Sequence, residues 1–158
     1  MYVALGKTSA WADESNPPLE SAMTSSITEV IGYKKVTAAQ LCRDYETGDE
    51  TGNTVVSYGG KKYTIIPDDK RYTEKAWYVF VTAEIGENDF DPTPFRQVGL
   101  YIDLTPKSGV TKTNLKPSEV EVNGNLQAFT NQKMQQLDGN TIITSNWLFS
   151  FDNSKSLG

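Results

Sequence analysis

The residue types that carry most enzyme chemistry are scarce in this sequence. The chain has no histidine and a single cysteine, Cys42. Without histidine there is no Ser-His-Asp or Cys-His arrangement and no imidazole to serve as an acid–base catalyst. One cysteine cannot build a structural zinc site or an intrachain disulfide. Because apolar residues surround it, we expect Cys42 to be a small buried hydrophobe.

Carboxylates are the remaining candidates, and they gather in two predicted loops: Asp44, Glu46, Asp49 and Glu50, then Glu87, Asp89 and Asp91. Calcium requires several oxygen ligands that converge from a constrained loop. Neither loop has the EF-hand spacing, so we interpret these carboxylates as solvated. Two carboxylates from distant positions could also hydrolyse a glycoside, but no particular pair is indicated. The sequence therefore predicts no catalytic residue, no cofactor and no metal site.

A short match to a phosphate-binding loop occurs near the N-terminus. Gly6-Lys7-Thr8 resembles the end of that motif. The full motif requires a glycine five residues before Gly6, and Met1 stands there instead. We therefore expect no nucleotide at Lys7.

Length and charge limit the remaining functions. The chain has 158 residues, a net charge of −5 and a pI of about 4.8. An acidic protein is a poor binder of nucleic acid or of an anionic membrane. No segment approaches the roughly 18 apolar residues of a membrane span, and no secretory signal is visible. The length predicts a single domain over residues 1–158, with 151–158 as a flexible tail.

Two long β-prone segments are predicted to form the centre of the fold. Ala76–Ile85 is apolar on both faces through its first half, which is typical of a strand covered on both sides. Phe95–Leu104 alternates between apolar and polar residues, as a half-buried strand does. A loop rich in Gly, Asn, Asp and Pro separates the two segments. We expect them to pair as a long-looped antiparallel hairpin.

One helix is predicted near the N-terminus. Apolar residues there recur at the spacing of one helical face: Met23, Ile27, Val30 and Ile31. Pro17 and Pro18 precede the segment and Gly32 follows it, as start and stop signals. We expect its apolar face to lie on the sheet.

Shorter segments are predicted to supply the other strands: Tyr2–Leu5, Tyr33–Arg43, Thr54–Tyr58, Lys61–Ile66, Asn125–Phe129 and Asn140–Phe151. Gly59-Gly60 separates two of them with the composition of a tight hairpin turn. Many strands with one helix predict a mainly β fold. The expected architecture is an antiparallel β-sandwich with one short N-terminal amphipathic helix and long loops.

Aromatic and proline residues in the predicted loops are candidates for contacts with other proteins. Trp11 lies in a polar loop ahead of two prolines, so it either fills the protein's own core or reaches a partner. The candidate interface residues are Lys7, Trp11, Pro17, Pro18, Tyr72, Phe90 and Phe95.

Three co-linear segments resemble the baseplate wedge proteins of contractile-tailed bacteriophages. The first, YVALGKTSAWADESNPP, has a strand, Gly6, a small polar run, Trp11 and a polar loop that ends in prolines. The second, FRQVGLYIDLTP, has an Arg-Gln pair before alternating apolar residues and a short proline loop. The third runs from Gly124 through Asn131 to a closing strand that ends at Phe151.

This resemblance implies a structural, non-enzymatic β-sandwich subunit of a baseplate wedge. Such a subunit would assemble with other baseplate wedge and tail proteins, with a homodimer as one form of self-association. It would be made in the host bacterial cytoplasm and reside in the virion, without contact to nucleic acid or membrane. The alternative is a carbohydrate- or receptor-binding β-sandwich module of a phage tail, whose exposed aromatics stack on sugar rings.

Overall fold

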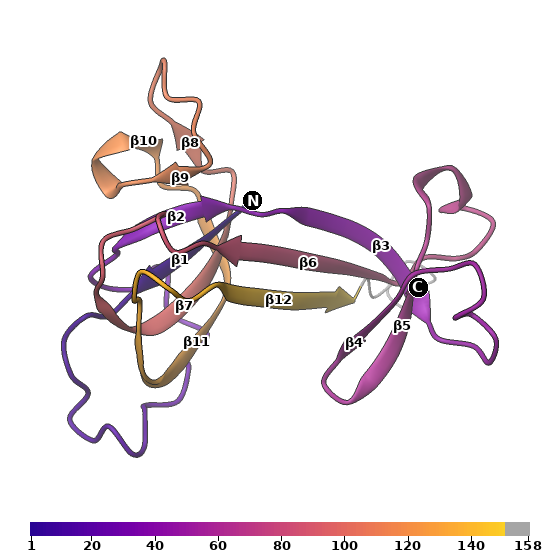
Figure 1. Cartoon of the computed structure of the whole chain (residues 1–158), viewed down its shortest axis with the longest axis horizontal. Helices are drawn as coiled ribbons and strands as arrows, with labels where there is room; N and C mark the ends of the chain where they lie inside the picture. Colours follow the sequence, from indigo (N-terminus) through magenta and orange to yellow (C-terminus); the bar gives the residue numbers. More distant parts are fainter. Residues whose placement is uncertain (151–158) are drawn as a thin grey trace. The chain divides into compact units, whose positions relative to one another are not determined.

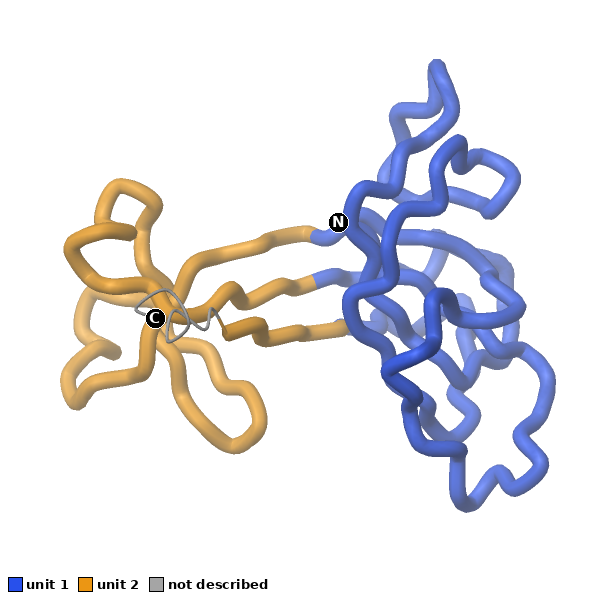
Figure 2. Tube along the Cα trace, turned by 180° about the vertical axis from the view of Figure 1, so that it is seen from behind, with its two compact units in different colours: residues 1–36, 83–144 blue, residues 37–82, 145–158 orange. Residues whose placement is uncertain are grey.

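A computed structural model describes residues 1–150 of the chain. Antiparallel strands make up the fold, and this described range contains no α-helix. The chain divides into two compact units (Figure 2). Unit 1 consists of residues 1–36 and 83–144, and unit 2 of residues 37–82 and the segment from 145 onward.

Twelve strands and two 3₁₀ turns occur in the described range (Figure 1). They are β1 (Tyr2–Gly6), β2 (Gly32–Lys35), β3 (Ala38–Asp44), β4 (Val55–Tyr58), β5 (Lys61–Ile65), η1 (Asp68–Lys70), β6 (Tyr78–Ile85), β7 (Pro94–Ile102), β8 (Thr105–Pro106), β9 (Asn114–Leu115), η2 (Pro117–Glu119), β10 (Val120–Val122), β11 (Asn125–Gln136) and β12 (Ile143–Ser150). Strands β6 and β12 cross the boundary between the units.

Unit 1 contains a five-stranded sheet in the order β11-β7-β1-β2-β9, and β8 and β10 form a separate pair. The predicted N-terminal strand is confirmed as β1. It pairs with β7 on one side, Val3 opposite Leu100, and with β2 on the other. Val3, Ala4 and Leu5 are completely buried. β1 is therefore the central strand of this sheet, covered on both faces.

One buried cluster of unit 1 lies on the face of this sheet that carries Tyr2 and Ala4. Tyr33 and Tyr101 meet there edge to face, with ring centroids 5.6 Å apart, a geometry that aromatic pairs prefer. The buried members of this core are Tyr2, Ala4, Ile27, Tyr33, Tyr101, Leu104, Leu115 and Val120. Burying a large apolar side chain of this kind contributes about 1.5–3 kcal/mol.

The second sheet has the order β12-β6-β3-β5-β4. The predicted hairpin is confirmed as β4 and β5, with Tyr58 opposite Lys61. Its turn residues Gly59 and Gly60 have φ angles of 58° and 78°, as a tight turn of this type requires. The core beside this hairpin includes Cys42. Cys42 is fully buried as expected, and burial raises the pKa of its thiol to about 11.

The predicted central hairpin is wrong. β6 pairs with β3, whereas β7 pairs with β1 and β11, so the two strands lie in different sheets. The loop between them is too long to fix a register. Contacts between strands that are distant in the sequence determine which strands β6 and β7 pair with.

The predicted helix is also wrong, because residues 23–31 form no helix. Of the predicted apolar stripe, Ile27 is buried but Met23 is almost fully exposed. Serine and threonine side chains compete for backbone hydrogen bonds and disfavour helices. Residues 23–31 contain four of them: Thr24, Ser25, Ser26 and Thr28.

Other segments differ mainly in their bounds. The predicted strand 33–43 is divided into β2 and β3, and β11 extends well beyond Phe129. The closing strand is present as β12, while Phe151 lies outside the described residues. A mainly β fold of antiparallel sheets is confirmed. The sandwich arrangement and the single domain over 1–158 stay predictions.

Candidate interface surfaces

Residues 7–31 form an irregular loop between β1 and β2, called here the N-terminal loop, and Arg96 of β7 anchors its first part. The Arg96 side chain is almost fully buried. Its Nε donates a 2.7 Å hydrogen bond to Glu14 Oε1, and its Nη1 donates one of 2.7 Å to the Thr8 carbonyl. Charge-assisted bonds of this length are the strong ones. The loop is therefore fixed to the sheet at two points by one side chain.

Trp11 lies within this anchored part of the loop and is half-buried. Its indole Nε1 donates a 2.9 Å hydrogen bond to the Gln132 carbonyl of β11. The Lys7 ammonium lies 5.3 Å from the centre of the indole ring, within reach of a cation–π interaction. Trp11 thus packs on its own unit and still keeps part of its ring exposed.

Gln97 of β7 and Asn131 of β11 connect the later part of the loop to the sheet. Gln97 Oε1 accepts a 2.9 Å bond from the Thr28 backbone N–H, and Gln97 Nε2 donates to Asn131 Oδ1 at 2.8 Å. Asn131 Nδ2 in turn donates to the Pro18 carbonyl at 2.9 Å. Linked amides of this kind orient one another and fix their partners.

This loop covers a strand that the sequence predicted to be half-buried. β7 is buried from Phe95 to Tyr101, because Ile27 packs against Gly99 on its polar face. The Tyr101 hydroxyl accepts a 3.0 Å hydrogen bond from the Ile27 backbone N–H. The predicted segment therefore does lie on the sheet, but through an irregular backbone rather than a helix.

Two apolar side chains on the N-terminal loop point to solvent. Leu19 is 92% exposed and Met23 is 90% exposed. Leu19 is held from both sides, because Asn131 binds the Pro18 carbonyl before it and the Glu20 carboxylate after it. The sequence analysis missed Leu19 and placed Met23 on an inner helix face. No sequence pattern indicates that these two side chains are exposed; only the structure of the folded loop shows it.

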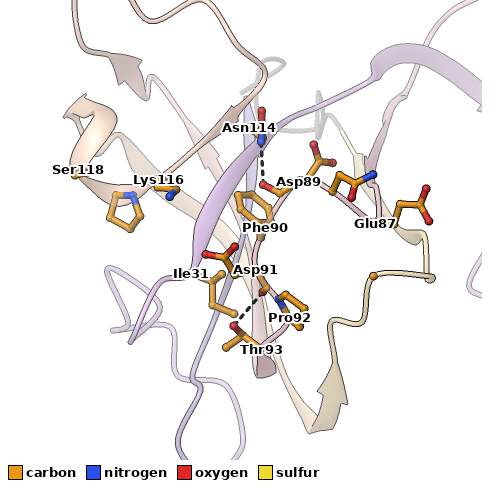
Figure 3. Close-up of a pocket in the computed structure, with 13 residues that line it drawn as sticks. Ile31, Glu87, Asp89, Phe90, Asp91, Pro92, Thr93, Asn114, Lys116 and Ser118 are labelled. Atoms are coloured by element: carbon orange, nitrogen blue, oxygen red, sulfur yellow. Dashed lines mark hydrogen bonds between the residues drawn. The ribbon is translucent and has the colours of Figure 1, made fainter.

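A hollow of about 770 Å³ lies elsewhere on unit 1, beside the loop between β6 and β7 (Figure 3). Asp89 is one of its lining residues. Its Oδ1 pairs with Lys34 Nζ at 2.7 Å, and its Oδ2 accepts a hydrogen bond from the Gly86 N–H at 2.7 Å. Asn114 Nδ2 donates to the Asp89 carbonyl at 2.8 Å. Because these contacts use both oxygens of Asp89, the carboxylate is structural.

Phe90 forms a wall of the same hollow (Figure 3). A methyl group at Gly32 would overlap the Phe90 ring and come within 2.8 Å of the Leu115 carbonyl. Glycine at position 32 is therefore what allows the ring to pack against β2. Phe90, predicted as an interface anchor, is partly buried in this position.

Asp49 organises the first acidic loop, in unit 2. Its Oδ2 accepts bonds from Arg43 Nη1 at 2.7 Å, from Thr64 Oγ1 at 2.6 Å and from the Glu46 N–H at 2.8 Å. Its Oδ1 accepts a further bond from Arg43 Nη2 at 2.9 Å. The hydrogen bonds from Arg43, and then those from Thr64 and Glu46, hold the pKa of Asp49 well below its usual range. The interpretation of Asp49 and Asp89 as solvated carboxylates is wrong.

Unit 2 is expected to lose stability in acid through Asp49. Because its folded pKa is depressed, the stabilisation is fully present above the unfolded value of about 4 and is lost as the pH falls through the folded pKa. Wild type should therefore lose thermal stability between pH 4 and pH 2 more steeply than Asp49→Asn, which should be less stable at pH 7. Circular dichroism melts across this range check the difference. Parallel stability curves would contradict the role given to Asp49.

The other predicted interface residues fall into two groups. Phe95 is fully buried at the start of β7, so it is a core residue and its proposed role as an anchor is wrong. Tyr72 is highly exposed, Pro18 is exposed, and Lys7 and Pro17 are half-buried. Their contacts with other proteins stay predictions. So does the carbohydrate-binding alternative, for which exposed Tyr72 is the natural stacking residue.

Within residues 1–150, no three Asp, Glu or Cys side chains converge in a way that could hold a metal ion. In the same range no helix is long and apolar enough to cross a membrane. The notable features of the described surface are thus anchored loops and exposed apolar side chains.

Comparison with known proteins agrees with the earlier resemblance. The family model described as "Baseplate wedge 3 tail fiber network component" matches residues 1–151. The chain belongs to this family. It is also 42% identical, over 157 residues, to "Virion protein 3" of Enterococcus phage phiEF24C, an alignment that covers 99% of this chain and 87% of the relative. The resemblance is therefore confirmed, and the protein is a structural component of a phage baseplate.

Proposed function

We propose that this baseplate protein acts by protein–protein assembly within the wedge, with the N-terminal loop as a principal contact surface. The observation that carries the proposal is the presentation of Leu19. Its neighbours Pro18 and Glu20 are both bonded to Asn131, yet the side chain itself is 92% exposed. Exposure of an apolar side chain to water is unfavourable, so burial of Leu19 in a neighbouring subunit would be favourable.

Pre-organisation supports this role. Ordering a loop at the moment of binding costs affinity, whereas a loop that is already fixed avoids that cost. Arg96, Gln97 and Asn131 fix the N-terminal loop during folding. Burying Leu19 and Met23 in a neighbour would then contribute about 1.5–3 kcal/mol for each side chain.

The double variant Leu19→Ala/Met23→Ala tests this surface. Its incorporation into baseplates should fall by about tenfold or more, since the lost burial exceeds 1.4 kcal/mol. Its melting temperature should stay within about 2 °C of wild type, because both side chains are exposed. Quantitative mass spectrometry of purified tail particles measures the incorporation.

A matched control is Val122→Ala/Ile142→Ala, which removes two exposed apolar side chains from other parts of unit 1. This control should be incorporated like wild type. If both double variants are incorporated normally, the N-terminal loop is not a principal contact surface. If the loop variant unfolds, Leu19 or Met23 supports the fold in a way that their exposure does not predict.

A further inference from the structure

The edges of the unit 1 sheet are protected against pairing with another chain. An edge strand exposes unpaired N–H and C=O groups, and proteins usually cover, bend or shorten it. On β11, the Asn131 N–H is bonded to the Glu20 carboxylate, and the Gln132 carbonyl is bonded to Trp11. Its register with β7 also shifts between Asn131 and Gln135. The opposite edge strand, β9, has two residues.

The described part of the chain protects only one edge of the sheet that contains β12. Its edge strand β4 has four residues, whereas β12 at the other edge has eight. β12 has the sequence ITSNWLFS, without a charged residue or proline. β6 is its neighbour on one side (Figure 1), and no other strand of the described range pairs with its free side. Within residues 1–150, β12 is therefore a long, neutral edge without the usual protection.

The residues of β12 alternate along the strand. Trp147 is buried, and Ile143 and Phe149 share its face and are half-buried. Thr144, Asn146 and Ser150 on the opposite face are exposed, while Leu148 there packs on the core around Cys42. Any strand added at this edge has to continue an apolar face and a mainly polar face.

We propose that β12 of one copy pairs antiparallel with β12 of a second copy, so that the two sheets become continuous. A two-fold axis perpendicular to the sheet keeps corresponding residues on the same face. The apolar face of Ile143, Trp147 and Phe149 would then continue across the junction. Like charges opposite one another destabilise such a pairing, and β12 carries none. The inference rests on the assembly role proposed above and names a second copy as one partner.

Charge substitution at Asn146 tests the pairing in the full chain. We place the two-fold axis at the middle of β12, between Asn146 and Trp147. Asn146 of one copy then lies close to Asn146 of the other, so a charge at this position meets the same charge in the second copy. Asn146→Lys and Asn146→Glu should each weaken self-association by about tenfold or more. An equimolar mixture of the two should restore it, because opposite charges then meet. Analytical ultracentrifugation between about 1 and about 100 µM follows the dimer.

Ser57→Glu on β4 is the matched control, since it places a charge on the short edge of the same sheet, opposite Lys62 of β5. It should dimerise like wild type. Wild type that stays monomeric, unaffected Asn146 variants, or a mixture that fails to restore the dimer would each overturn the pairing. A monomeric chain that still enters baseplates would overturn this inference alone. A dimeric chain that is absent from baseplates would overturn the assembly role instead.

Discussion

Replacing Gly124 with alanine is expected to destabilise unit 1 by about 3 kcal/mol or more. Gly124 has a φ angle of 71°, where a Cβ atom is already strained. The added methyl group would also overlap the Ile102 carbonyl oxygen and lie 2.7 Å from the Leu104 nitrogen. Both obstacles are backbone atoms, which cannot turn aside as a flexible side chain can. Urea denaturation followed by intrinsic fluorescence measures the loss.

Gly60→Ala is the control for backbone strain alone. Gly60 has a φ angle of 78°, but no atom lies within 4 Å of its added Cβ. Its expected cost is therefore about 1 kcal/mol. Equal losses in the two variants would show that the close approach at Gly124 is not what requires glycine there. Gly124 directly precedes β11, and β11 carries Asn131 and Gln132, which bind the N-terminal loop. The comparison therefore also concerns the support of the candidate surface.

Arg96→Met is expected to lower the free energy of unfolding by about 2–3 kcal/mol and to release the N-terminal loop. The variant removes the donors to Glu14 and the Thr8 carbonyl while keeping a long apolar side chain. Glu14 Oε2 is already buried without a partner in the described range, so the Glu14 carboxylate would be left poorly satisfied. Hydrogen exchange of residues 8–20 should accelerate, and urea denaturation measures the stability.

Lys62→Met offers a matched comparison, since it also removes one cation from an ion pair. The Lys62–Glu50 pair joins two exposed side chains 3.2 Å apart, and such pairs contribute about 0.5 kcal/mol or less. Arg96→Met should therefore cost several times more. If the two variants lose the same stability, or if exchange in 8–20 is unchanged, Arg96 does not anchor the loop.

Local signals predicted the parts of the fold that depend on few residues. A few neighbouring residues were enough to predict the strand at Val3–Leu5 and the turn at Gly59-Gly60, and both predictions are confirmed. Strand pairing is different. β6 and β7 are adjacent in the chain but belong to different sheets, because β7 is held by β1 and β11. A short stretch of sequence around β6 and β7 does not indicate these pairings, because β1 and β11 are distant from it in the chain.

The candidate surface was less predictable for the same reason. Hydrogen bonds that fix the N-terminal loop to β7 and β11 join residues 69 to 121 positions apart, from Thr28–Gln97 to Trp11–Gln132. Such contacts replace a helix that periodicity alone favoured. Residue type pointed to Trp11 and Lys7, which do meet in the anchored loop. It could not indicate that Leu19 would be exposed.

Site-specific photo-crosslinking in assembled baseplates tests the central claim most directly. A photoreactive phenylalanine analogue would replace Leu19 in one preparation and the exposed Val122 in another. The account predicts a covalent adduct with another baseplate subunit from position 19 and a weaker adduct, or none, from position 122. Particles that contain the protein but give no adduct from position 19 would contradict an assembly role for the N-terminal loop.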